Sequence, residues 1–495
     1  MPAVNGSRVL LIGLDSVDVD YLQSHLGNLP TLKRLFTGGV VRRLDSPGDV
    51  MSASVWPTFY TGTPPGEHGR YFTVQWDPAS MRFRHVASDW IDSEPFWRPL
   101  AREGLPVTTL DVPMAYPSRT TAGVEVVNWG AESFGNFHCN RPDIGREIAR
   151  RFGTNVLGPD VPVDKSRRRL ARLRERLLAV AKRRGELCRW LMKQTAWNLF
   201  VAVFPECHRA GHLFWRDASA SDAGAPDDDV VLEVHRAVDR EVGALIEAAE
   251  APDTSVVVFS LHGMETNHSQ MHLVRPVIER INATFASPSG VPPAGRPRAK
   301  RNLTGLLRER LPTSIQEGVA LAIPVGLRQW LVGRSYDREV DWRTTPGFAL
   351  PTAGQGYVRL NVVGREARGC LARGSARYSQ YLESVHEAFL SLRDAGTREP
   401  LVDSISAPGE RFPGPRSDYL PDLSIAWRPV APATAAHSDR LGTFTGRLKT
   451  GRGGNHRPAA FAAVSGPARD FPRSASLRTI IDLTGMVRNL VVGPK

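Results

Sequence analysis

Three uninterrupted apolar runs constrain the fold of this chain more than any other feature. They lie at Arg8–Leu14, Asn198–Phe204 and Ser255–Ser260, and each contains β-branched residues. Short, continuous apolar runs are typical of strands that are buried on both faces, as in parallel sheets covered by helices. A segment with a helical pattern, Val19–Thr37, follows the first run. Another, Val230–Ala249, lies between the second and third runs. This alternation predicts an α/β fold with a mostly parallel central sheet flanked by helices.

The length of 495 residues allows one large domain with an inserted cap, or two domains. We expect residues 1–265 and 427–495 to form the α/β core. Residues 266–426 would then form an inserted cap that recognises the substrate. Within the cap, Ser287–Arg301 is rich in Pro, Gly and basic residues, which predicts a loop or linker.

The chain is basic, with 63 Lys and Arg against 51 Asp and Glu and a net charge of +12. Such a balance favours anionic partners, although an Arg-rich composition with solvated charges explains it equally well. The segment Lys165–Arg184 predicts a basic amphipathic helix. Nucleic acid or anionic lipid is one interpretation of this helix. A solvated face is the favoured one, because no aromatic residues are interleaved. We therefore infer no specific nucleic acid partner, and the oligomeric state stays open.

The cysteines and the apolar segments bear on the cellular compartment. Cys139, Cys188, Cys207 and Cys370 are far apart, which predicts neither a disulfide scaffold nor a zinc ribbon. The N-terminal apolar run ends at Asp15 and is too short for a signal peptide. No stretch approaches the roughly 18 apolar residues of a membrane span. These observations predict a cytoplasmic protein without a membrane span.

Two polar residues follow predicted secondary structure in positions that suit phosphate chemistry. Asp15 directly follows the first apolar run, and ligands of open α/β sheets bind at the carboxyl ends of strands. Ser52 precedes a helix predicted at Ser54–Tyr60, whose free N–H groups suit a phosphate. A hydroxyl group activated by a metal there can attack phosphorus. The alternative is that Asp15, Ser52 and Ser54 only cap helices.

Histidines complete a candidate metal centre. His208 and His212 follow the second apolar run, and their spacing of four places both imidazoles on one helix face. His262 and His456 end other predicted strands, and Glu206 is a further candidate ligand. A single histidine is more often structural, but a set at strand ends predicts a metal site. Sites rich in histidine favour zinc over magnesium.

Taken in order, the motifs resemble those of the type I phosphodiesterase / nucleotide pyrophosphatase branch of the alkaline-phosphatase superfamily. The resemblance rests on Gly-x-Asp at Gly13–Asp15, Ser52 four residues before Trp56, Thr61-Gly62, His68-Gly69, and the later segments Val358–Gly369, Tyr419–Trp427 and Gly454–Pro467. It extends over nearly the whole chain. Each motif is weak by itself, and the ordered series is specific.

The resemblance implies an alkaline-phosphatase-like fold and a metal-dependent phosphoesterase. The substrate would be an anionic small molecule, most simply a phosphodiester or a related phosphate ester. Ser52 would attack phosphorus and form a covalent phosphoryl-enzyme. The resemblance also implies two sites for a divalent ion such as Zn²⁺, one held by Asp15, Ser52 and His262 and the other by His208, His212 and His456.

Two positions depart from the family pattern. Leu261 stands where the family has an Asp, and His208 also replaces an Asp. Both changes remove negative charge, which weakens the binding of two divalent cations. One ion or two therefore remain open, with Glu206 favoured over Glu265 and Asn267 as a compensating ligand.

Other functions remain open at this point. A transferase could use the same covalent intermediate, and a degenerate protein could bind metal without activity. A sulfatase is disfavoured, because the Cys/Ser-x-Pro-x-Arg motif is absent around Ser52.

Overall fold

The computed structural model describes residues 7–493 apart from 87–89, 92, 118–121, 131–135, 159–165, 216–228, 250–252, 287–326, 328–329, 331–339, 353 and 471–476. The predicted loop at Ser287–Arg301 lies outside the described residues.

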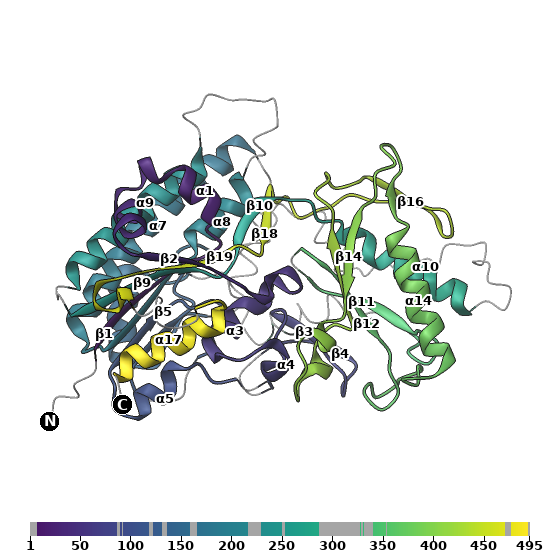
Figure 1. The fold of residues 1–495 in the computed structure, drawn as a ribbon, viewed down its shortest axis with the longest axis horizontal. Helices are drawn as coiled ribbons and strands as arrows, with labels where there is room; N and C mark the ends of the chain where they lie inside the picture. The colour runs from purple at the N-terminus through teal and green to yellow at the C-terminus, as the bar shows by residue number, and fades with distance from the viewer. Residues whose placement is uncertain are drawn as a thin grey trace.

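An eight-stranded sheet forms the larger lobe (Figure 1). Its strands are, in spatial order, β2 (Val40–Leu44), β19 (Ala460–Ser465), β9 (Thr254–Ser260), β1 (Arg8–Leu14), β8 (Leu199–Phe204), β5 (Val107–Leu110), β6 (Val124–Val127) and β7 (His138–Cys139). The five strands from β9 to β6 are parallel, whereas β19 and β7 run antiparallel to their neighbours. The predicted mostly parallel sheet is confirmed.

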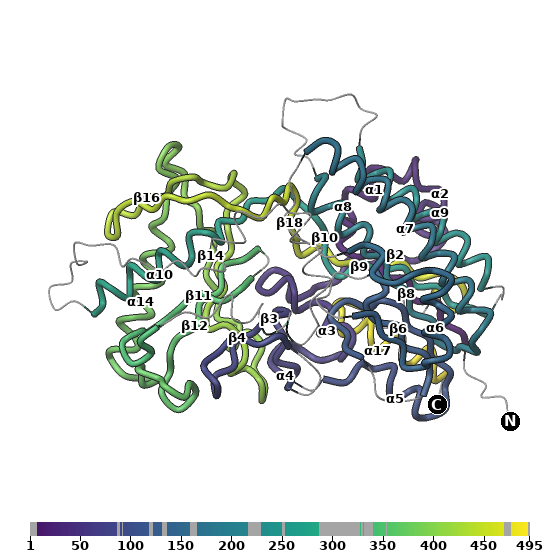
Figure 2. Tube along the Cα trace, turned by 180° about the vertical axis from the view of Figure 1, so that it is seen from behind, coloured from purple at the N-terminus to yellow at the C-terminus, as the bar shows by residue number. Residues whose placement is uncertain are grey.

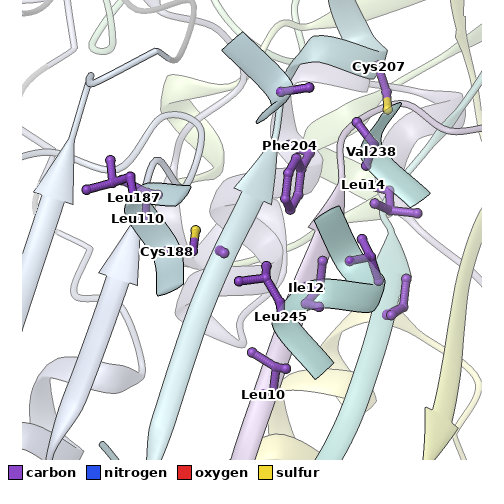
Figure 3. Close-up of a cluster of buried hydrophobic side chains, with 14 of the residues drawn as sticks. Leu10, Ile12, Leu14, Leu110, Leu187, Cys188, Phe204, Cys207, Val238 and Leu245 are labelled. Atoms are coloured by element: carbon purple, nitrogen blue, oxygen red, sulfur yellow. The ribbon is translucent and has the colours of Figure 1, made fainter. Parts of the chain in front are cut away.

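Alternate residues of β1 face opposite sides of the sheet, as the period of a strand requires. Leu10, Ile12 and Leu14 belong to the apolar cluster on one side (Figure 3). The helices that pack there are α1 (Val19–Ser24), α2 (Pro30–Gly38), α6 (Pro142–Phe152), α7 (Arg167–Gln194), α8 (Glu206–Phe214) and α9 (Val230–Ala248). Val9 and Leu11 belong to the cluster on the other side, with α3 (Val55–Thr61), α5 (Trp97–Arg102) and α17 (Ile480–Val492). Helices therefore cover both faces.

Two predicted helices have different bounds in the structure. The helix predicted at Val19–Thr37 is divided into α1, a 3₁₀ turn at Leu26–Asn28, and α2. Pro30 begins α2, because proline has no N–H to continue a preceding helix. The basic helix continues ten residues beyond its predicted end at Arg184, to Gln194. Leu187 and Leu191 maintain its apolar spacing and are fully buried.

A second lobe lies beside the first and has its own apolar cluster (Figure 1). Its four-stranded antiparallel sheet has the order β11 (Gly347–Leu350), β12 (Gly356–Leu360), β15 (Leu423–Trp427) and β14 (Val402–Ser406). It also contains α10 (Met271–Ala286), α14 (Ala376–Leu390), β13 (Arg393–Asp394), β16 (Ala435–Ser438) and β17 (Gly442–Thr445). The apolar cluster includes Leu441 and Phe444, which lie beyond the expected end of the cap at Ala426. We propose that the chain returns to the larger lobe between Phe444 and Gly454.

A short antiparallel ribbon lies between the lobes. It pairs β10 (Gly263–Thr266) with β18 (Gly454–Arg457), and both views place it there (Figures 1 and 2). A hairpin of β3 (Val74–Asp77) and β4 (Arg82–His85) also reaches the second lobe, where Trp76 packs against Phe348. None of the helices in the described part of the chain has the length and apolar character that a membrane span requires.

Candidate active site

Four histidines from three parts of the chain form one cluster. α8 begins one residue after β8 and presents His208 and His212, whose ring centroids are 4.4 Å apart. β18 brings His456 to 4.7 Å from His212. His262, two residues after β9, stacks on His456 with a centroid separation of 4.1 Å. The four predicted histidines therefore come together.

Three of the histidines, His208, His212 and His456, have ring nitrogens that lie close to one another. His212 Nδ1 lies 2.9 Å from the carbonyl oxygen of Gly454 and must donate to it, because a carbonyl only accepts. His212 Nε2 then carries a lone pair and no hydrogen, and this atom is buried without a hydrogen-bond partner. His208 Nε2 and His456 Nε2 are 3.0 Å apart. Tetrahedral zinc holds neighbouring nitrogens about 3.3 Å apart, so this arrangement is compatible with a metal ion.

The ligand atoms of His208, His212 and His456 all lie within 4.8 Å of one another. We call these three residues the histidine trio. Burial lowers the pKa of His212 and of His456 well below the ordinary value, and neighbouring positive charge, including that of Arg452, lowers both further. Neutral imidazole is the form that binds metals, so the trio fits a divalent ion at neutral pH.

Asp15 links the histidines to the helix that carries the predicted nucleophile. Its Oδ1 accepts a hydrogen bond of 3.0 Å from Trp56 Nε1, in α3. Its Oδ2 lies 3.5 Å from His208 Nδ1, and Oδ1 lies 4.0 Å from His262 Nε2. A carboxylate on the far nitrogen of a metal-binding histidine orients the ring and raises its basicity. In this structure Asp15 occupies such a position behind His208.

Ser52 begins a 3₁₀ turn, Ser52–Ser54, that leads into α3. Its side chain is buried, and its Oγ donates to Gln355 Oε1 at 3.2 Å. Gln355 Nε2 donates in turn to the carbonyl oxygen of Gly48 at 3.0 Å. Gln355 directly precedes β12 of the second lobe, so this contact joins the two lobes at Ser52. No sequence motif marks Gln355, which is 303 positions away.

The bounds of the α3 segment differ slightly from those predicted. Ser54 occupies the N-cap position but makes no capping hydrogen bond, and its hydroxyl donates to the carbonyl oxygen of Arg70 at 2.8 Å. Gly62 ends the helix in the left-handed region with φ of 66°, as expected for a glycine stop.

Glu206, a candidate ligand in the sequence, is engaged elsewhere. Its Oε1 accepts a hydrogen bond of 2.8 Å from Arg184 Nε, and Arg184 Nη1 donates at 2.8 Å to Asp111. All three side chains are fully buried. Burial raises the pKa of Glu206, although Arg184 opposes this effect. Glu206 is not part of the histidine trio, and the solvated face expected for the basic helix does not extend to Arg184.

Leu261 lies in the apolar cluster that contains Trp56 and Phe259 and is 1% exposed. Its hydrocarbon side chain packs with these rings, and it supplies no ligand atom.

An open cleft of about 340 Å³ is lined by residues that adjoin β10 and β18 in the sequence. Asn267, Thr450, Arg447 and Arg452 are among its lining residues, and no carboxylate lines it in the described part of the chain. The N–H of Gly453, next to Arg452, donates to the carbonyl oxygen of His212 at 2.8 Å. The cleft is therefore basic, and the chain segment that lines it continues into β18, which carries His456.

Comparison with known proteins identifies the family. A sequence model of the type I phosphodiesterase / nucleotide pyrophosphatase family matches residues 9–310. The chain belongs to this family. It is a member of the alkaline-phosphatase superfamily and a phosphoric ester hydrolase. No curated protein matched in a sequence comparison.

One solved structure agrees with this assignment at the level of the fold. Phosphonoacetate hydrolase from Sinorhizobium meliloti 1021 is 13% identical, with a TM-score of 0.50 over 98% of this chain and 96% of the hydrolase. Murine ectonucleotide pyrophosphatase / phosphodiesterase 5 is also 13% identical, with a TM-score of 0.45 over 98% and 95% of the two chains. Enzymes of the family normally depend on divalent metals, and the histidine trio offers a place for one.

Proposed function

We propose that this chain is a metal-dependent phosphoesterase that cleaves a phosphodiester or a related ester through a covalent adduct on Ser52. The observation that carries the proposal is the histidine trio, in which His212 directs a buried lone pair without a partner toward two other imidazoles. Asp15 connects this trio to α3 through Trp56, four residues after Ser52.

The reaction assigns separate tasks to the residues. Ser52 Oγ forms a bond to phosphorus as the bond to the leaving oxygen breaks, and the departing alcohol carries the proton that Ser52 loses. Water then attacks phosphorus, and Ser52 leaves with a proton from that water. A divalent ion held by the trio would supply positive charge near the phosphate oxygens. His208, His212 and His456 would hold that ion, and Asp15 would hold the His208 ring in position. His262 packs against the trio, because its ring stacks on that of His456.

Zinc is the proposed ion, because all three ligands of the trio are imidazoles. The experiment is a screen of 4-nitrophenyl phosphate, bis(4-nitrophenyl) phosphate and a nucleotide pyrophosphate, with metal counting on the same sample. Zinc should stimulate the hydrolysis of at least one ester, and Ser52→Ala should abolish it with fold and metal content nearly unchanged. Protein that binds no metal and hydrolyses none of these esters would refute the proposal.

The proposed substrate is an anionic small molecule. Arg447 is exposed in the cleft, and in the described part of the chain it has no ion-pair partner. Thr450 Oγ1 accepts from the N–H of Arg452 at 3.4 Å, which leaves the hydroxyl hydrogen to donate. These groups suit an anionic part of the substrate beyond the reacting phosphate.

We also propose the cytoplasm as the compartment. Cys139, Cys188, Cys207 and Cys370 are all free thiols, and the first three are buried. Free thiols persist in a reducing compartment. Cell fractionation of a tagged chain tests this assignment.

A further inference from the structure

The four positions expected to hold a second metal ion do not form a metal site in this structure. This inference rests on the proposed function, because it concerns the residues around Ser52. The family resemblance requires Asp15, Ser52, His262 and a carboxylate at position 261 to surround one ion. Among the described residues, the only group of three or more histidine, cysteine or acidic side chains with converging ligand atoms is the histidine trio.

Asp15 already has partners on both oxygens. Trp56 Nε1 donates to Oδ1 at 3.0 Å, and His208 Nδ1 lies 3.5 Å from Oδ2. The nearest nitrogen of His262 is 4.0 Å from Oδ1. Asp15 and His262 supply one ligand each, and no third histidine, cysteine or acidic side chain among the described residues forms a converging group with both, whereas a tetrahedral ion takes four ligands. The carboxylate acts here on His208.

Leu261 removes the only other negative charge that the second site would have. Its side chain packs in the apolar cluster with Trp56 and Phe259. A divalent ion beside this cluster would lose hydration, and Asp15 alone would supply negative charge in return. Such a balance disfavours a second ion.

Gln355 fixes the orientation of the Ser52 hydroxyl through a hydrogen bond. The orientation of its amide is fixed, because Nε2 donates to the carbonyl oxygen of Gly48 at 3.0 Å. Oε1 must therefore face Ser52, and it accepts the Ser52 hydroxyl hydrogen at 3.2 Å. This bond points the Ser52 O–H group toward Gln355. The lone pairs of the Ser52 oxygen therefore point away from Gln355.

We propose that this chain binds a single divalent ion, at the histidine trio, and that Gln355 takes the place of a second ion in positioning Ser52. Gln355 is a positioning residue, because it acts through the serine hydroxyl. The second lobe thereby contributes directly to the reaction centre.

Metal counting tests the first half of the proposal. Purified chain is dialysed to equilibrium against Zn²⁺, and bound zinc is measured by mass spectrometry. We expect one ion per chain in the wild type and in His262→Gln, and none in a variant with both His212→Ala and His456→Ala. Two ions per chain with intact hydrolysis would overturn the single-ion proposal and leave the proposed function standing. No bound zinc and no hydrolysis would overturn both.

Kinetics of Gln355→Met tests the second half, with Gln380→Met on exposed α14 as the matched control. Gln355→Met loses the side-chain hydrogen bonds to Ser52 and to Gly48, and loss of the bond to Ser52 should lower kcat by about three- to tenfold with KM nearly unchanged. The zinc content should remain at one ion, and the control should behave as the wild type. An unchanged kcat, or equal changes in both variants, would overturn the role of Gln355.

Discussion

At the scale of single residues, His68 shows how burial fixes a protonation state. It is buried, its Nδ1 accepts the N–H of Arg70 at 3.0 Å, and its Nε2 lies 3.0 Å from Thr58 Oγ1. Burial, and then the positive charges of Arg70 and Arg416, lower the pKa of His68 from 6.5 to about 3. His68 is therefore neutral in the folded chain over a range of pH in which the unfolded chain protonates it.

This difference predicts how His68 affects stability. The contribution of neutral His68 to the free energy of unfolding is fully present above pH 6.5, the pKa in the unfolded chain. It is lost as the pH falls toward the folded-state pKa of about 3. At pH 5 the loss is about 2 kcal/mol. Urea denaturation at pH 7 and pH 5 should show a smaller acid-induced loss in His68→Gln than in the wild type. Identical losses in both proteins would contradict the assignment.

At the scale of elements, the buried pair of Arg184 and Glu206 fixes the helix that carries His208 and His212. Arg184 lies in α7 and bonds Glu206 at the start of α8, and it also bonds Asp111 at the end of β5. The three groups connect two helices and a strand. Arg184 is the positive partner of both buried carboxylates, so its loss leaves two buried groups of like charge without that partner.

Replacement of Arg184 should therefore be costly. Arg184→Met leaves two buried carboxylates unpaired, which should lower stability by about 3–5 kcal/mol. Arg183→Met, at the exposed neighbouring position, is the matched control. The urea midpoint and the zinc affinity should both fall in Arg184→Met alone. Equal midpoints for the two variants would show that the buried pair does not support α8.

The elements show where sequence patterns are sufficient and where they are not. The run at Arg8–Leu14 predicts β1 with its observed bounds, because a strand buried on both faces needs continuous apolar residues. The basic segment predicts a helix correctly. It does not reveal that Arg184 is buried, because a sequence pattern contains no information about distant carboxylates. The sequence does not reveal the hydrogen bond between Glu206 and Arg184 for the same reason.

At the scale of the whole molecule, the candidate site lies where the two lobes meet. Gln355 comes from the second lobe and Ser52 from the first, and the basic cleft adjoins the ribbon between them. Convergence of Asp15, His208 and His262 was predictable, because strands of a parallel sheet end at the same edge. The contact between Ser52 and Gln355 depends on how the lobes pack, which local sequence patterns do not encode.

The cleft gives a prediction about the substrate. Arg447→Gln removes an exposed charge and should raise KM for a nucleotide pyrophosphate by roughly tenfold, with little effect on KM for bis(4-nitrophenyl) phosphate. Arg488→Gln, at an exposed position of α17, removes the same charge and should change neither value. Equal KM values for Arg447→Gln and the wild type on both esters would exclude the cleft from substrate binding.

The attack by Ser52 is the central claim, and trapping of the adduct tests it most directly. The zinc-loaded chain is mixed with bis(4-nitrophenyl) phosphate, quenched in acid, digested and analysed by mass spectrometry. We predict a 4-nitrophenyl phosphoryl adduct on the peptide that contains Ser52, and its absence from Ser52→Ala. An adduct on a different residue, or turnover of Ser52→Ala at the wild-type rate, would contradict the account.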